Sequence, residues 1–218
     1  DKTSLDLPAD QRRMLEEARA LGKPLVLVLM SGSAVNLAWA KTHASAIVAA
    51  WYPGQSGGLA VAEVLSGKEN PGGRLPVTFY ESVADLPPFD DYAMKGRTYR
   101  YFAGKPVYPF GAGLSYTSFQ YAPLQVAASG GKPESGITVT THITNTGTRD
   151  GDEVAQLYLT PPAFEGAPRL ALRGFERVAL KAGQRKQISF KLSPRDLSFV
   201  TRDGERQLMP GLHTLSVG

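Results

Sequence analysis

The six residues 25–30 constrain the fold of this chain more than any other segment. They read Leu-Val-Leu-Val-Leu-Met and are apolar at every position, without the alternation of a strand that has one face in water. A strand carries such a run only when both of its faces are covered, as in a parallel sheet flanked by helices. The run is also much shorter than the roughly 20 apolar residues that cross a bilayer. We therefore expect a central strand of an α/β sheet here.

The surrounding residues alternate between helical and strand patterns. The expected elements are helix 8–21, helix 35–42, strand 46–51, helix 59–65 and strand 74–79. This β-α-β-α-β order predicts a partial α/β sandwich in residues 1–80. Three strands with so few helices leave strand faces and a sheet edge uncovered, so this half of the chain requires a partner.

A glycine-rich turn, residues 52–58, joins the second strand to the following helix. Such a turn can hold a phosphate, yet it lacks both the dinucleotide fingerprint and the Lys-Ser/Thr pair of a P-loop. We expect instead that Gly57 and Gly58 let the helix pack closely on the sheet. Of the functional hypotheses for this chain, nucleotide binding ranks last.

Residues 81–118 show no regular period, and prolines and glycines interrupt them throughout. So long a segment without regular structure is usually functional or packed across a surface. Its aromatic residues fit two interpretations. They could form the rim of a site where they stack on sugar rings, or they could pack between two domains. Tyr92 and Arg97 are the residues we expect at a rim rather than in packing.

Residues 119–218 change to a period of two. Strands are expected at 137–144, 154–159, 170–180, 186–192 and 212–217. Glycine-containing turn signals separate them, and about seven short strands of this spacing predict an antiparallel sandwich of the immunoglobulin or fibronectin type. The fold class is thus α/β plus all-β, with residues 81–118 as a connecting segment.

Composition and charge argue against metal, cofactor and nucleic-acid sites. The chain has no cysteine and three scattered histidines, so we expect neither a metal site nor a cofactor. Its net charge of +4 comes from interspersed lysines and arginines, which indicates a solvated surface rather than a nucleic-acid site. Asp150, Asp152 and Glu153 lack the ligand order of an EF-hand, so we expect solvated acids in a hairpin.

Three phrases in the middle of the chain carry a resemblance. They are Asn-Pro-Gly-Gly-Arg-Leu-Pro-Val-Thr at 70–78, Gly-Arg-Thr-Tyr-Arg-Tyr-Phe at 96–102 and Tyr-Pro-Phe-Gly-Ala-Gly-Leu-Ser-Tyr at 108–116. Together the phrases resemble the C-terminal portion of glycoside hydrolase family 3. Residues 170–178 and 192–199 are similar to the fibronectin type III-like domain of that family. Ala112 and Asn36 depart from the family pattern, which usually has an aromatic residue and an aspartate there.

The resemblance implies an exo-acting, retaining β-glycosidase of the β-xylosidase or β-glucosidase type, and residues 94–102 look more like the β-xylosidase branch. Retention requires two carboxyl groups roughly 5 Å apart. In the family both precede the position of Asp1, which itself matches an aspartate just after the acid/base residue. We therefore assign no catalytic residue to this chain and expect it to be inactive alone.

The remaining expectations concern the site and its partners. Asp90 with Asp91 is the only close carboxylate pair worth testing, and the resemblance favours Asp91, Tyr92 and Arg97 as a substrate-binding pocket rim. Expected partners are the N-terminal portion of the same enzyme and a glycoside or oligosaccharide substrate, with a homodimer left open and no nucleic acid or membrane. The parent enzyme is expected to be periplasmic or secreted. The rival reading is a noncatalytic carbohydrate-binding or assembly module.

Overall fold

The computed structural model describes residues 3–218, so the expectation for Asp1 lies outside the described residues. The chain forms two compact units. The first contains residues 3–69 and 75–112, and the second contains residues 70–74 and 113–218. No helix within residues 3–218 has the length and apolar content needed to cross a bilayer.

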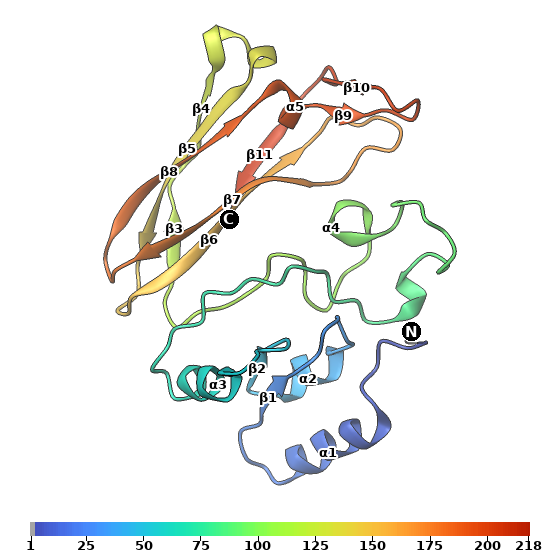
Figure 1. Cartoon of the computed structure of the whole chain (residues 1–218), viewed down its shortest axis with the longest axis vertical. Helices are drawn as coiled ribbons and strands as arrows, with labels where there is room; N and C mark the ends of the chain where they lie inside the picture. The colour runs from blue at the N-terminus through green and yellow to red at the C-terminus, as the bar shows by residue number, and fades with distance from the viewer. Residues whose placement is uncertain (1–2) are drawn as a thin grey trace. The chain divides into compact units, whose positions relative to one another are not determined.

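The first unit combines short helices with a two-stranded parallel sheet. Its elements are α1 (Ala9–Ala20), β1 (Val26–Leu29), α2 (Ala38–His43), β2 (Ala46–Ala49), α3 (Gly57–Leu65), η1 (Val83–Asp85) and α4 (Thr98–Tyr101) (Figure 1). β1 and β2 run parallel with Val26 opposite Ala46. The expected α/β character is confirmed.

The prediction of a third strand at residues 74–79 is wrong. Only Phe79 forms an isolated antiparallel bridge, with Tyr108. The segment pairs with a loop instead: the N–H of Leu75 donates to the carbonyl of Ala112 at 2.8 Å. Pro76 lies in the middle of the segment and has no N–H to donate, so a continuous ladder cannot form across it.

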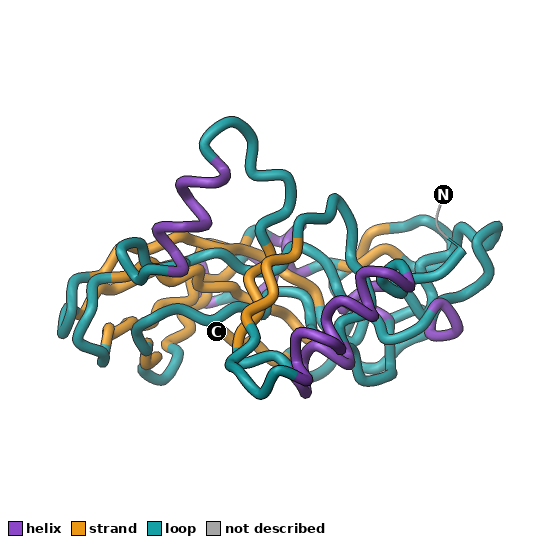
Figure 2. Tube along the Cα trace, turned by 90° about the horizontal axis from the view of Figure 1, so that it is seen from below, coloured by secondary structure: helices purple, strands orange, loops and turns teal. Residues whose placement is uncertain are grey.

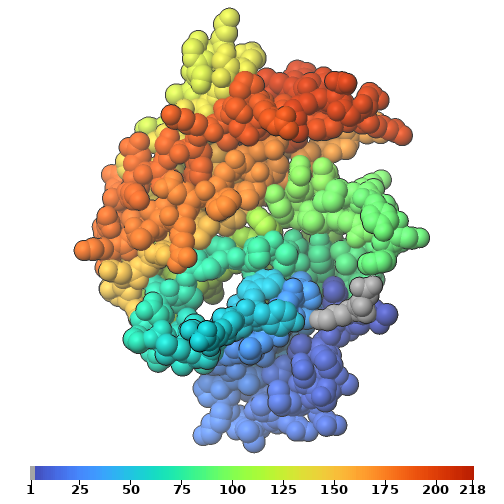
Figure 3. All heavy atoms as spheres, in the orientation of Figure 1, coloured from blue at the N-terminus to red at the C-terminus, as the bar shows by residue number. Residues whose placement is uncertain are grey.

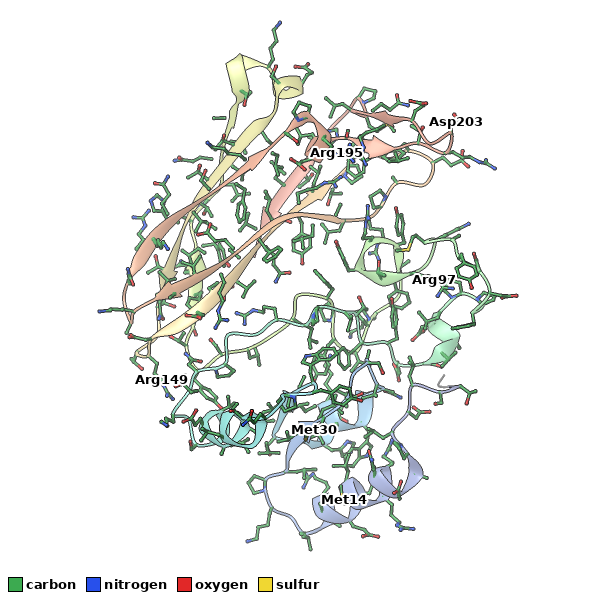
Figure 4. All side chains as sticks on the ribbon, viewed as in Figure 1. Met14, Met30, Arg97, Arg149, Arg195 and Asp203 are labelled. Atoms are coloured by element: carbon green, nitrogen blue, oxygen red, sulfur yellow. The ribbon has the colours of Figure 1, made fainter. Side chains whose placement is uncertain are left out.

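Many apolar side chains of the first unit are exposed. Only Leu29 of β1 is buried, while Val26 is 45% and Met30 63% exposed. On α1, Leu15 is buried, but Met14 is 59% exposed, and Leu21, just after the helix, is 75% exposed. The side chains of Met14 and Met30 are labelled in Figure 4. The apolar run of residues 25–30 is thus only partly shielded by the described residues.

The second unit is an antiparallel sandwich, and strands dominate it in the trace of Figure 2. Its elements are β3 (Phe119–Tyr121), β4 (Gln125–Ala128), η2 (Ser129–Gly131), η3 (Pro133–Ser135), β5 (Ile137–Asn145), β6 (Gly151–Thr160), β7 (Ala171–Leu180), β8 (Arg185–Leu192), α5 (Pro194–Leu197), β9 (Phe199–Val200), β10 (Arg206–Gln207) and β11 (Thr214–Val217). One sheet contains β3, β4, β5 and β8, and the other has the order β11-β6-β7. The predicted sandwich is confirmed.

Alternating side chains fill the core of the sandwich. Every second residue of β5 is buried, as expected for a strand with one face on the core. Val139 and Ile143 of β5 meet Leu157 and Leu159 of β6 in one apolar cluster, and all four are fully buried. The period of two in the sequence is therefore the pattern of inward-facing residues.

Candidate functional site

The three residues expected at a pocket rim lie in one loop of the first unit, residues 87–97, between η1 and α4. Arg97, labelled in Figure 4, holds this loop together. Its Nη2 donates to the carbonyls of Pro88 at 2.8 Å and Asp91 at 2.7 Å, and its Nε donates to the carbonyl of Ala93 at 3.3 Å. One guanidinium therefore satisfies three backbone acceptors of the loop.

Short-range hydrogen bonds fix the same loop from within. The backbone N–H of Asp91 donates to the carbonyl of Pro88 at 3.0 Å, and Oδ1 of Asp91 accepts from the N–H of Ala93 at 2.8 Å. Gly96 has φ of +74°, a left-handed conformation that suits glycine. The loop thus has a defined backbone.

Aromatic residues support the loop where it enters α4. The N–H of Thr98, a residue with φ of +58°, donates to the hydroxyl of Tyr80 at 2.7 Å. The ring of Tyr80 meets that of Phe102 edge-on at 4.9 Å, and Tyr99 stacks on Phe110 at 4.3 Å. These four aromatics pack inside the first unit rather than presenting free faces to a ligand.

Two other aromatic rings of the loop point into solvent. Tyr92 is 92% and Phe89 86% exposed, and the green segment that carries them lies on the visible surface in Figure 3. The structure therefore brings Asp91, Tyr92 and Arg97 together and adds Phe89, which sequence reasoning missed. Its position three residues before Tyr92, next to two aspartates, was the available signal.

The paired carboxylates Asp90 and Asp91 are both exposed. Acidic side chains in solvent are the ordinary case on a protein surface and do not by themselves indicate a catalytic pair. Within residues 3–218, no three His, Cys, Asp or Glu side chains are grouped so that they could hold a metal ion. The loop therefore offers contact surface rather than reactive groups.

The glycine-rich turn before α3 carries no reactive constellation either. Residues 54–58 fit the G-x-S-x-G spacing, but Ser56 has an unstrained φ of −93° and stands at the N-cap position of α3 without a side-chain capping bond, while β2 ends earlier at Ala49. A Cβ on Gly57 would lie 2.4 Å from Cγ of Pro53, whereas one on Gly58 would have no neighbour within 4 Å. The expected close packing is therefore wrong for Gly58.

A buried ion pair anchors the phrase 70–74 to the sandwich. Nη2 of Arg74 lies 2.5 Å from Oε2 of Glu153, and the two side chains are 12% and 8% exposed. The hydroxyl of Tyr121 donates to Oε1 of Glu153 at 2.8 Å, and burial, followed by this bond, raises the pKa of Tyr121 well above its ordinary value. The expectation that Glu153 is solvated is wrong, because Arg74 reaches it from 79 residues away.

Asn70 fastens the other end of the phrase. Its Nδ2 donates to the carbonyl of Asp150 at 2.8 Å, and its Oδ1 accepts from the N–H of Tyr116 at 2.7 Å. Both oxygens of Glu153 are occupied by Arg74 and Tyr121. This cluster is therefore an anchor and not a catalytic pair.

Comparison with known families decides the assignment. The glycosyl hydrolase family 3 C-terminal domain matches residues 1–116, and the fibronectin type III-like domain matches residues 153–218. The chain belongs to glycosyl hydrolase family 3. The resemblance carried by the three phrases, and the fibronectin-like nature of the sandwich, are confirmed.

Individual family 3 proteins match the whole chain. A xylan 1,4-beta-xylosidase of Xylanibacter ruminicola is 44% identical over 100% of this chain and 25% of its own length. A periplasmic beta-glucosidase of Salmonella typhimurium is 36% identical over 100% of this chain and 30% of its own length. The crystal structure of a Bifidobacterium adolescentis GH3 beta-glucosidase superposes with a TM-score of 0.91 at 33% identity, over 100% of this chain and 34% of that one. The chain therefore spans about a quarter to a third of these relatives and corresponds to the C-terminal portion of family 3 proteins.

Proposed function

We propose that this chain is the C-terminal part of an exo-acting, retaining β-glycosidase that hydrolyses terminal nonreducing β-D-xylosyl or β-D-glucosyl residues. The observation that carries the proposal is the match of the entire chain to a β-xylosidase and a β-glucosidase of which it covers 25% and 30%. The greater identity to the xylosidase, 44% against 36%, favours xylosides. The periplasmic relative supports a periplasmic or secreted parent enzyme.

Both catalytic carboxyl groups belong, in this proposal, to the preceding part of the enzyme. Retention needs a pair roughly 5 Å apart, one attacking the anomeric carbon and the other donating and then accepting a proton. The candidates in this chain do not suit these roles, because Asp90 and Asp91 are exposed and Glu153 is fully engaged. The chain by itself is therefore inactive.

The N-terminal portion of the same enzyme is the proposed partner of the first unit. Exposed apolar side chains on α1 and β1 and just beyond them provide the surface that it would cover, namely Met14, Leu21, Val26 and Met30. The loop of residues 87–97 contributes the rim of the sugar pocket, with Asp91, Tyr92 and Arg97.

The test combines this chain with the N-terminal portion of its parent enzyme and measures hydrolysis of aryl β-xylosides and β-glucosides. Activity is expected from the combination and from neither part alone, and the β-anomer of the sugar is expected as the first product in an NMR time course. A combination inactive on both sugars would contradict the proposed function. Activity of this chain alone would contradict the placement of the carboxyl groups.

A noncatalytic carbohydrate-binding module is the second candidate, and the exposure of Phe89 and Tyr92 is what favours it. Calorimetric titration of this chain with xylo- and cello-oligosaccharides separates the two. Binding at millimolar concentration or weaker supports the enzyme part, and tight binding supports the module.

A further inference from the structure

The loop of residues 87–97 joins a fixed backbone to exposed aromatic rings. Arg97 ties the carbonyls of Pro88, Asp91 and Ala93 together, while Phe89 and Tyr92 are 86% and 92% exposed. Single exposed apolar residues are common on protein surfaces. Two rings within four residues, on a backbone held by one guanidinium, form a preorganised contact surface.

Polar groups with free bonding capacity lie in the same loop. Oδ2 of Asp91 and Nη1 of Arg97 have no hydrogen-bond partner among residues 3–218. An apolar protein surface packed here would leave these charged groups buried without partners, which is costly. A sugar offers both apolar C–H faces for the rings and hydroxyl groups for the charged atoms.

The exposure of the rings indicates which part of a glycoside they meet. The sugar that is cleaved must be held closely, because two carboxyl groups flank its anomeric carbon at a separation of roughly 5 Å. Rings that the described residues leave 86% and 92% exposed cannot enclose it by themselves. They can cover one face of a unit that projects from the pocket, which in an exo-acting enzyme is the leaving group.

We propose that Phe89 and Tyr92 contact the leaving-group side of the glycoside and that Arg97 is the positioning residue that holds both rings in place. This rests on the proposed function. Arg97 acts through its fork of donors, which reaches several carbonyls at once; a lysine ammonium cannot reproduce that geometry. A positive charge at residue 97 is therefore not enough to hold the loop in place.

The test uses the complete enzyme that contains this chain and two substrates for each sugar, a methyl β-glycoside and a β-1,4-linked tetrasaccharide. The methyl glycoside has almost no leaving group to contact, whereas the tetrasaccharide has three further sugar units. Tyr92→Ala and Phe89→Ala are each expected to raise KM for the tetrasaccharide roughly fivefold to tenfold and to lower kcat/KM for the methyl glycoside by a clearly smaller factor. Phe175→Ala, which removes another exposed ring in β7, is the matched control and is expected to change neither.

A double-mutant cycle tests the role of Arg97. Arg97→Ala and Arg97→Lys are expected to raise KM for the tetrasaccharide as Tyr92→Ala does, and to raise KM for the methyl glycoside by a smaller factor. Adding Tyr92→Ala to Arg97→Ala is expected to have little further effect, because the released loop no longer presents Tyr92. Fully additive effects would overturn the positioning role.

The outcomes separate the two proposals. If the complete enzyme cleaves no β-glycoside, the proposed function falls and this inference falls with it. If the enzyme is active but the loop variants behave like Phe175→Ala, the inference is overturned and the proposed function stands. If Phe89→Ala and Tyr92→Ala lower the melting temperature without changing KM, the rings are covered by the preceding part of the enzyme, which also overturns the inference.

Discussion

Replacing Arg74 by Met would leave the carboxylate of Glu153 buried without its charged partner. The two side chains are 12% and 8% exposed, so solvent cannot replace the lost contact. Removing one member of a buried ion pair costs about 3–5 kcal/mol. Because the hydroxyl of Tyr121 still donates to Glu153, we expect a loss at the lower end, about 3 kcal/mol in the free energy of unfolding.

Removing both charges should lower the free energy of unfolding less than removing one of them does. In the double variant Arg74→Met with Glu153→Leu no buried charge of this pair remains. The hydroxyl of Tyr121 loses its acceptor, and the carbonyls of Gly72 and Gly73 lose the Nη1 donor of Arg74, so we expect a loss of about 1–2 kcal/mol. The exposed pair Arg177–Asp152, whose side chains are 68% and 30% exposed, joins β6 to β7 and provides the control. Arg177→Met should cost less than about 1 kcal/mol.

Urea and thermal unfolding of the whole chain, followed by far-UV circular dichroism, measure these changes. Trp39 and Trp51 both lie in the first unit, so their fluorescence follows that unit separately. A loss of about 3 kcal/mol corresponds to a fall of roughly 10–20 °C in the transition of the sandwich. The reasoning is refuted if Arg74→Met costs no more than Arg177→Met, or if the double variant is less stable than both single variants.

The same structure makes three further predictions. Burial raises the pKa of Tyr121, so its phenol ionises at lower pH in the unfolded chain than in the folded one, and the stability of the sandwich should fall as pH rises above about 10. Tyr121→Phe should flatten this decline in unfolding curves measured between about pH 9 and 11. An unchanged decline would contradict the prediction. A Cβ on Gly113 would lie 2.4 Å from the carbonyl oxygen of Gly73, so Gly113→Ala should cost about 1–3 kcal/mol by urea unfolding, and a neutral result would show that the phrase 70–74 can move. Gly58 is helical with open space around it, so Gly58→Ala should instead stabilise the chain by about 0.4–1 kcal/mol, a gain that a calorimetric melting curve would either show or refute.

The sequence alone determined the elements whose burial follows a local period. The apolar run at 25–30 became β1, and the alternating segments of residues 119–218 became the strands of the sandwich. The hydrophobic pattern of a strand is visible over a few consecutive residues, so such a strand can be predicted without knowing which segment it packs against. The family phrases are equally local, and they were sufficient to identify glycosyl hydrolase family 3.

For the candidate loop, the sequence located the residues but not their roles. Asp91, Tyr92 and Arg97 do share one loop, as the motif suggested. That Arg97 bonds to backbone carbonyls, and that Phe89 is exposed beside Tyr92, depends on how the loop folds back on itself. No spacing rule specifies such irregular backbone.

Only the tertiary structure decided the contacts between distant segments. Glu153 reads as a solvated hairpin acid until Arg74, 79 residues earlier, is placed against it. Residues 74–79 read as a third strand until Leu75 and Phe79 pair with a loop some 30 residues later. The physical reason is the same in both cases. The free energy of burying a charge or of pairing two strands depends on which residue supplies the opposite charge or the hydrogen bonds, and the local sequence does not specify that residue.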